Sequence, residues 1–395
     1  ALMHYENVLA TIGNTPLIRM NRIAQEIPAK VFAKVESYNP GQSAKDRIAL
    51  FMIEEAERAG KLKPGGTIVE ATSGNTGFSI AMVSSIKGYR CILTLTSKAS
   101  PEKISLLKSM GAQVVICPVD VEPADPRSYY SAAERIAHET PNSFYLAQNF
   151  NLDNAEAHYR STGPEIWKQT RGKITHFICC AGTGGTLSGT ARYLKEKNPD
   201  IKIIGVDAYG SVLKKFWETH EYDPNEIKPY KVEGLGKNII PHNMNFELVD
   251  DFVKVTDKDS AFQARDLAKY EGLMVGYSSG SAMQAVFEIA DELSKDDVVV
   301  VLFSDHGSRY LGKIFNDEWM VEQGWMECEP AEAAAGMGST PPVKHFEHYA
   351  PAEATGSAAY FYSYEAMRDR YIKYYHTYRL KYKKYIRLTR QTLGL

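Results

Sequence analysis

The sequence lacks the features that mark several classes of protein. It contains no apolar run of the roughly 18 residues that a membrane-spanning helix needs, so we expect no membrane segment. The first residues, ALMHYENVLA, lack a basic segment followed by an apolar core and do not form a secretory signal. The 46 basic and 48 acidic residues nearly cancel, to a net charge of −2, which predicts no general attraction to nucleic acid.

Cysteine is also scarce, and its spacing does not suit a metal site. The chain has five cysteines, with no CxxC pair and no Cys/His spacing typical of zinc ligands. Four of them lie in apolar, strand-like runs, where we expect buried free thiols: Cys91, Cys117, Cys179 and Cys180. The fifth is Cys328. This usage favours a reducing, cytoplasmic setting and predicts no metal.

Strand-like and helical segments alternate along most of the chain. Runs rich in β-branched residues include TIVEA (67–71), THFICCA (175–181) and DVVVVLF (297–303), each bounded by Gly, Pro, Asn, Asp or Lys. Helical periodicity separates most of these runs. The pattern predicts an α/β fold with mostly parallel sheets, and no internal repeat is visible.

The 395 residues are enough for two domains with well-filled cores. We expect a smaller α/β domain over residues 40–150 and a larger one over 1–39 and 151–325. Residues 326–359, rich in small residues and proline, are predicted to form a linker or arm. Residues 360–395 carry nine basic and two acidic residues with tyrosines at helical spacing, which predicts a basic helical tail. Such a tail could pack on this chain or a partner subunit, or contact an anionic surface.

The stretch SYNPGQSAKDRIAL (37–50) places a lysine where a helix disfavours one. Ser43 and Asp46 predict a capping box before a helical run to Gly60, so Lys45 falls in the first turn. The positive end of the helix dipole repels a cation there. Either the side chain turns into solvent, or its amine functions in a form other than the ammonium ion.

Three glycine-rich turns each follow a strand and precede a helix, in EATSGNTG, CCAGTGGT and VGYSSGS. Such turns present backbone N–H groups at a helix N-terminus, where an anion can bind. The second turn, Gly182 to Thr186, suits a phosphate best. The first, Thr72 to Thr76, suits a small carboxylate, and Ser278 in the third can bond a single ligand atom. Each could also be ordinary helix capping.

A dinucleotide fingerprint is the alternative for the second turn. Gly182 and Gly184 follow a strand, and Asp207 ends the next one. Leu187 stands in place of the third glycine, however, and a nicotinamide-binding dehydrogenase leaves Lys45 without a function. An inactive core that displays the basic tail to a partner is a third possibility.

In combination, these motifs resemble the pyridoxal-phosphate enzymes of the tryptophan-synthase-β fold type, and among them the cysteine synthase and cystathionine β-synthase family. The resemblance covers residues 5–325 and favours the cystathionine β-synthase branch. It implies two doubly wound three-layer domains with pyridoxal 5'-phosphate at their interface, and a homodimer. Its motifs are IGNTPL (12–17), NPGQSAKDRI, TSGNTG, GTGGT, VEGLGKNIIP (232–241), VGYSSGS and HGSRYLGKIFNDEWM.

The resemblance also implies roles for individual residues. Lys45 matches the catalytic lysine that forms a Schiff base with the cofactor. Asn75 matches the residue at the cofactor's ring hydroxyl and Ser278 the partner of its pyridine nitrogen, while the phosphate loop matches Gly182, Thr183, Gly184, Gly185 and Thr186. The substrate-binding residues that it implies are Thr72, Ser73, Asn75, Thr76, Gln148 and Gly234.

The implied reaction is β-replacement on an amino acid, which forms L-cystathionine from L-serine and L-homocysteine through an aminoacrylate. Cysteine synthesis from O-acetylserine and sulfide is the alternative, with sulfide release from cysteine as a side reaction. A dehydratase or a diaminopropionate-type synthase also remains open. Asn149 follows Gln148 where the cystathionine β-synthase pattern has a tyrosine. The preferred leaving group and the preferred thiol substrate therefore stay open. Regulatory nucleotide-binding modules and a haem-binding extension are not recognisable.

Overall fold

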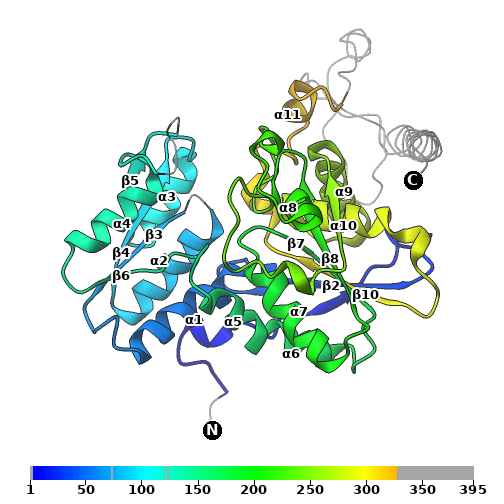
Figure 1. Ribbon diagram of the computed structural model, residues 1–395, viewed down its shortest axis with the longest axis horizontal. Helices are drawn as coiled ribbons and strands as arrows, with labels where there is room; N and C mark the ends of the chain where they lie inside the picture. Colours follow the sequence, from blue (N-terminus) through cyan, green and yellow to red (C-terminus); the bar gives the residue numbers. More distant parts are fainter. Residues whose placement is uncertain (1–2, 73, 120, 122–123, 327–395) are drawn as a thin grey trace, which may run out of the picture. The chain divides into compact units, whose positions relative to one another are not determined.

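The computed structural model describes residues 3–72, 74–119, 121 and 124–326 (Figure 1). The described residues up to 315 form one compact unit, and the described residues from 316 belong to a second. The predicted linker and tail therefore lie outside the described residues, apart from Met326, as do Ser73 and Cys328. None of the described helices is long and apolar enough to cross a membrane.

Two sheets organise the first unit, and almost all of their neighbouring strands are parallel. The larger sheet has the order β1-β2-β10-β7-β8-β9, and only β1 and β2 pair antiparallel. Its strands are β1 (Leu17–Arg19), β2 (Lys30–Val35), β7 (His176–Cys180), β8 (Lys202–Ala208), β9 (Asp251–Val255) and β10 (Val298–Phe303). The smaller sheet has the order β5-β4-β3-β6, with β3 (Thr67–Ala71), β4 (Arg90–Thr96), β5 (Gln113–Cys117) and β6 (Ser143–Tyr145).

Helices follow most strands, as parallel connections require. In the first unit they are α1 (Lys45–Arg58), α2 (Asn75–Lys87), α3 (Pro101–Ser109), α4 (Tyr129–Glu139), α5 (Asp153–Arg160), α6 (Thr162–Gln169), α7 (Gly185–Lys197), α8 (Leu213–Thr219), α9 (Asp257–Glu271) and α10 (Tyr277–Glu288). Short 3₁₀ turns cover Val8–Thr11, Glu36–Tyr38, Pro224–Glu226, Phe246–Leu248, Ala290–Glu292 and Gly307–Tyr310. Helix α11 (Asp317–Glu322) lies in the second unit. The predicted α/β fold class is confirmed.

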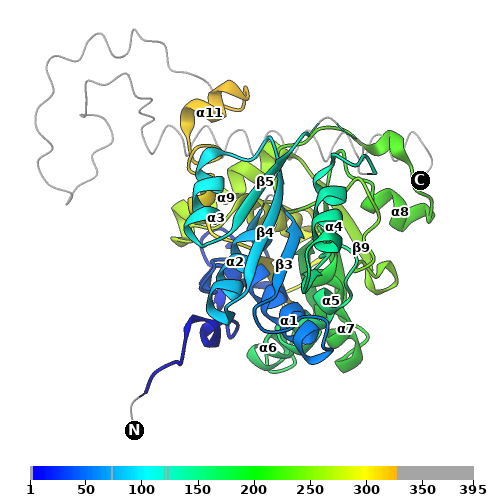
Figure 2. The ribbon, with the colours of Figure 1, turned by 90° about the vertical axis from the view of Figure 1, so that its left-hand side faces the viewer.

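The smaller sheet is the middle layer of three. Figure 2 shows α2 and α3 on one side of its strands and α4 on the other. Ile68 of β3 packs in the core shared with α1 and α2, whereas its neighbour Val69 packs with Ala133 of α4. Successive strand residues point to opposite faces, so both faces of β3 are apolar and the whole strand is buried.

The larger sheet has a separate core around β7, β8 and β10. β10 lies between β2 and β7, and its VVVVLF sequence is the continuous apolar run of a strand covered on both faces. β3 to β6 fall within the predicted 40–150 range, and the strands of the larger sheet fall outside it. The domain bounds themselves stay a prediction.

All four described cysteines are free and buried.

A buried ion cluster joins the first helix to the larger sheet. The guanidinium of Arg47 in α1 contacts Glu36 at 2.7 Å, just after β2, and Glu165 of α6 at 2.7 Å. Lys34 of β2 contacts the second oxygen of Glu165 at 2.6 Å. Because the Arg47 charge lies beside it, the pKa of Glu36 is lowered in spite of complete burial.

Replacing Arg47 should therefore destabilise the protein strongly. Arg47→Met leaves the Glu36 carboxylate buried without its main counter-charge, which costs about 3–5 kcal/mol. Urea denaturation should show this loss in the apparent free energy of unfolding. Arg58→Met is the matched control, since Arg58 is 64% exposed in its ion pair with Glu55 and should change that energy by less than about 0.5 kcal/mol. Equal effects of the two variants would contradict the importance of the cluster.

Candidate active site

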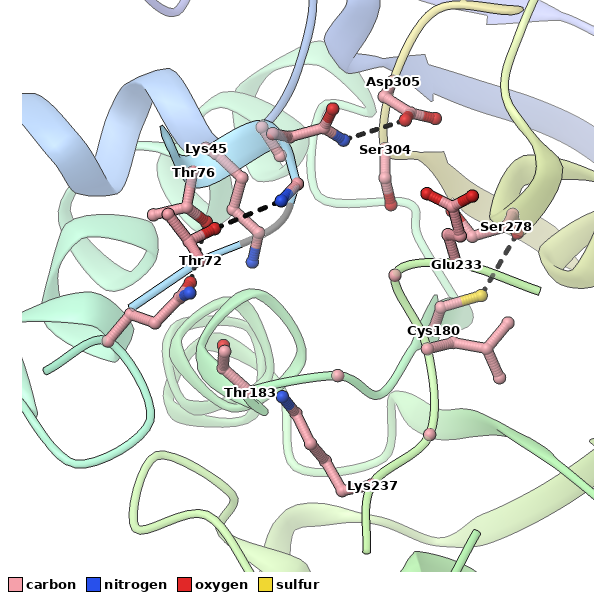
Figure 3. Close-up of a pocket in the computed structure, with 18 of the residues that line it drawn as sticks. Lys45, Thr72, Thr76, Cys180, Thr183, Glu233, Lys237, Ser278, Ser304 and Asp305 are labelled. Carbon is pink, nitrogen blue, oxygen red and sulfur yellow. Dashed lines mark hydrogen bonds between the residues drawn. The ribbon is translucent and has the colours of Figure 1, made fainter. Parts of the chain in front are cut away.

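A cavity of about 300 Å³ opens where strands of the two sheets end. Ala71 at the end of β3, Cys180 at the end of β7 and Ser304 directly after β10 all line it. In open α/β sheets, ligands bind beyond the carboxyl ends of parallel strands. The cavity brings together most of the predicted site residues: Lys45, Thr72, Asn75, Thr76, Gln148, Gly182, Thr183, Gly184, Thr186, Gly234 and Ser278. Figure 3 shows how several of them face its interior.

The predicted capping box at the start of α1 is wrong in its details. The helix begins at Lys45 with Ala44 as its N-cap, and the Ser43 hydroxyl accepts a hydrogen bond from the Lys45 N–H at 3.2 Å. The Asp46 carboxylate does not cap the helix, because it accepts from the Gly41 N–H at 2.5 Å and the Ser79 hydroxyl at 2.5 Å. The Asp46 carboxylate thus bonds residues outside the helix turn that it was predicted to cap. Lys45 nevertheless lies in the first turn, as predicted.

The Lys45 amine has no hydrogen-bond or ion-pair partner within the described part of the chain. It lines the cavity instead of turning into solvent. Burial lowers its pKa, while the thiol of Cys179 and the carboxyl group of Asp305 act in the opposite direction. A lysine with a lowered pKa is more often in the neutral form, which can act as a nucleophile or a base.

The Gly182–Thr186 loop forms a tight cradle before α7. Gly184 has φ +87°, and a Cβ atom there would lie 2.6 Å from the Cα of Met244. A Cβ atom on Gly185 would lie 1.9 Å from the Asn154 side-chain oxygen. Glycine therefore suits both positions, and the loop lies at the N-terminus of α7, where an anion can bind.

Asn154 holds this loop to a second part of the site. Its Nδ2 donates to the Thr183 hydroxyl at 3.0 Å and to the Gln148 carbonyl oxygen at 2.9 Å. The Gln148 side-chain oxygen in turn accepts from the Thr76 hydroxyl at 2.7 Å. The predicted carboxylate-binding residues Thr76 and Gln148 are therefore in direct contact, at the first turn of α2.

Asn75 and Ser278 lie on the other wall of the cavity. Asn75 donates to Asp305 at 2.8 Å, and Arg309 donates to the Asn75 side-chain oxygen. Ser278 is buried in the first turn of α10, and its carbonyl oxygen accepts from the Cys180 thiol at 3.2 Å. A Cβ atom on Gly234 would lie 3.7 Å from the Ser278 hydroxyl oxygen, so this turn closely approaches Ser278.

The family model of pyridoxal-phosphate-dependent enzymes matches residues 8–305. The chain belongs to this family. It is 45% identical to cystathionine β-synthase of Rattus norvegicus over 325 residues, which are 82% of this chain and 57% of that protein. It is 39% identical to cysteine synthase of Staphylococcus aureus over 308 residues, 78% of this chain and 95% of that one. The chain thus spans less than two thirds of the cystathionine β-synthase that it matches.

A solved structure agrees with this membership. The crystal structure of a hydrogen sulfide-producing enzyme from Fusobacterium nucleatum superposes with a TM-score of 0.71 at 34% identity. The match covers 78% of this chain and all of that one. The resemblance predicted from the motifs is therefore confirmed at the level of the family.

The cavity residues fit pyridoxal phosphate, the cofactor of this family. The glycine cradle lies at the N-terminus of α7, which suits a phosphate, and the Thr183 and Thr186 hydroxyls line the cavity there, that of Thr186 in a hydrogen bond of 3.1 Å with His158. The unpartnered Lys45 amine suits a covalent link to an aldehyde. Asp207, which the dinucleotide alternative needs, does not line the cavity, and its carboxylate accepts from the Lys214 N–H at 2.9 Å. The geometry therefore disfavours a nicotinamide site.

Sequence reasoning missed several residues of this site. Asp305 accepts hydrogen bonds from Asn75 and from Tyr310, the latter at 2.7 Å. Glu233, beside Gly234, contacts Lys103 of α3 at 2.7 Å and also bonds Lys313. Glu233 lies within the motif VEGLGKNIIP, and Asp305 directly precedes the motif HGSRYLGKIFNDEWM, so both could have been noticed. Nothing in the sequence singled out Lys103.

The cradle predicts that cofactor affinity depends on Gly185. Gly185→Ala should displace Asn154 and with it Thr183, and raise the dissociation constant of pyridoxal phosphate at least about tenfold, which is roughly 1.4 kcal/mol. Fluorescence titration of the apo protein measures this constant. Gly312→Ala is the matched control, since a Cβ atom there meets nothing within 4 Å. An unchanged constant for Gly185→Ala would show that the cradle tolerates a side chain.

Proposed function

We propose that this protein catalyses β-replacement on an amino acid and forms L-cystathionine from L-serine and L-homocysteine. The observation that carries the proposal is the half-buried Lys45 amine, without a partner among the described residues, in one cavity with a phosphate cradle and a hydroxyl–amide cluster. The similarity to cystathionine β-synthases and cysteine synthases supports the same class of reaction. A homodimer and a cytoplasmic setting are part of the proposal. The homodimer rests on the family resemblance, and the cytoplasmic setting rests on the free cysteines.

The substrate carboxylate binds at the start of α2 in this proposal. Thr72, Thr76 and Gln148 supply hydroxyl and amide groups there, and the predicted Ser73 lies outside the described residues. The N-terminus of the 13-residue α2 adds backbone N–H groups and the positive end of a helix dipole. These neutral donors orient the α-carbon toward Lys45 without a fixed cation.

Lys45 moves the proton. Its neutral amine removes the α-proton of the substrate, and the resulting ammonium returns a proton to the α-carbon at the end of the reaction. When bound, pyridoxal phosphate delocalises the electron pair that the α-proton leaves behind. In this proposal, the Ser278 hydroxyl would bond the pyridine nitrogen of the cofactor. A hydroxyl there, unlike a carboxylate, does not favour a protonated ring nitrogen, which favours loss of the β-substituent over transamination.

The bond changes balance without another reactant. The C–O bond at the β-carbon of serine breaks and a C–S bond to the thiol of homocysteine forms. The hydroxyl group leaves as water with the proton of the thiol. No electrons are gained or lost overall, so the reaction needs no oxidant or reductant.

Asn149 supports serine as the first substrate. It lines the cavity beside Gln148, and its buried side-chain oxygen has no hydrogen-bond partner among the described residues. A buried acceptor without a partner is costly, and a ligand hydroxyl would satisfy it. L-Serine carries such a hydroxyl on its β-carbon, whereas O-acetylserine has lost that donor.

Product analysis tests the choice of substrates. With L-serine and L-homocysteine, mass spectrometry should detect cystathionine, at a kcat/KM above that for cysteine formation from O-acetylserine and sulfide. Both assays use the same holoenzyme, so each serves as the control for the other. If the enzyme turns over O-acetylserine and sulfide but forms no cystathionine from L-serine and L-homocysteine, the proposal is overturned in favour of a cysteine synthase.

The role of Lys45 has its own test. Lys45→Ala should bind pyridoxal phosphate without the covalent link that borohydride reduction traps, and should lose turnover by at least about a thousandfold. Burial lowers the pKa of the free Lys45 amine. The kcat of the unchanged protein, which reports the substrate complex, should therefore rise with pH and level off below 10.5, the value for an ordinary lysine. Lys61→Ala, at an exposed site on the surface, is the control. An active Lys45→Ala variant would exclude this mechanism.

A further inference from the structure

A second lysine points into the same cavity without a partner. Lys237 lies in the turn that also contains Gly234, and it lines the cavity with Lys45 (Figure 3). In the described part of the chain, its ammonium group has no hydrogen-bond or ion-pair partner. The residue is half-buried, and a cation partly removed from water normally gains a counter-charge.

The backbone of this turn holds Lys237 in place. Its N–H donates to the Ser211 hydroxyl at 2.9 Å, and its carbonyl oxygen accepts from the Val212 N–H at 2.9 Å. The N–H of Gly236 donates to the carbonyl oxygen of Ala181 at 2.8 Å, which ties the turn to the end of β7. The side chain is thus carried by a fixed backbone and can serve as a precise binding group.

Among the described residues, no acidic group forms an ion pair with Lys237. Two acids line the described cavity wall. Glu233 contacts Lys103 and Lys313. One oxygen of Asp305 accepts from Asn75 and Tyr310, and its other oxygen has no hydrogen-bond partner among the described residues, but no ion pair joins Asp305 to Lys237 there. Glu70 forms no ion pair with Lys237 in the described structure. Burial raises the pKa of Glu70 to about 8, and its oxygens accept the backbone N–H groups of Ala71 and Gln148. Burial and the Lys45 charge lower the pKa of Lys237 to about 8, so it is still mostly protonated at neutral pH.

Two anions of the proposed reaction already have their own binding groups. The cofactor phosphate has the Gly182–Thr186 cradle, and the serine carboxylate has the first turn of α2. The remaining anion is the carboxylate of the thiol that attacks the β-carbon. We propose that Lys237 binds the carboxylate of this second substrate, and so selects carboxylate-bearing thiols over sulfide. This inference rests on the proposed β-replacement.

A matched pair of thiols tests it on the holoenzyme with L-serine. 3-Mercaptopropionate and 3-mercaptopropanol have the same chain length, and only the first carries a carboxylate. In Lys237→Met, the ratio of kcat/KM for the acid to that for the alcohol should fall at least about tenfold, the effect of losing one charge-assisted hydrogen bond. Lys237→Arg should keep most of the ratio, since it preserves the charge.

The alternatives give different results. An unchanged ratio in Lys237→Met would overturn the inference and leave the proposed function intact. A raised dissociation constant for pyridoxal phosphate, again with an unchanged ratio, would assign Lys237 to the cofactor phosphate and also overturn it. If the unchanged protein forms no product with any thiol, the proposed function fails and the inference falls with it.

Discussion

The buried ion cluster of Lys34, Glu36, Arg47 and Glu165 fixes where α1 begins. Two positive and two negative side chains meet across β2, α1 and α6, with contacts of 2.6 to 2.7 Å. In a medium of low dielectric constant, such a cluster has one favourable arrangement, because moving any member leaves a buried charge without its partner. Lys45 lies two residues before Arg47, so the same cluster fixes the position of the reactive amine.

The cavity combines neutral anion-binding groups with two unpartnered amines. The phosphate cradle and the start of α2 attract anions through backbone N–H groups, hydroxyls and amides. Of the two acids in the described wall, Glu233 is neutralised by Lys103 and Lys313, whereas Asp305 accepts hydrogen bonds from the neutral groups of Asn75 and Tyr310. Burial outweighs the attraction of nearby acidic groups for Lys45 and Lys237, and lowers the pKa of both. Partial burial of these amines costs free energy, and binding of anionic ligands offsets that cost. Ligand binding should therefore stabilise the folded site.

Much of the site was predictable because its chemistry is local in sequence. A glycine-rich turn between a strand and a helix presents its N–H groups wherever the fold places it, so Gly182–Thr186 and Thr72–Thr76 could be recognised from their residue types. Asp46 was misinterpreted for the opposite reason. Its residue type fits a local cap, but Gly41 and Ser79 offer the carboxylate two hydrogen bonds of 2.5 Å in the folded protein.

The sequence by itself determined the α/β class, the strand-turn-helix units and the small residues that make the cradle, because these follow from periodicity and side-chain size. Only the tertiary structure decided which charges are partnered. Glu233 meets Lys103 across 130 residues, and Asn75 meets Asp305 across 230. Whether Lys45 and Lys237 meet a counter-charge depends on such distant contacts. No local pattern encodes them, since the Coulomb energy of a charge depends on its neighbours in space.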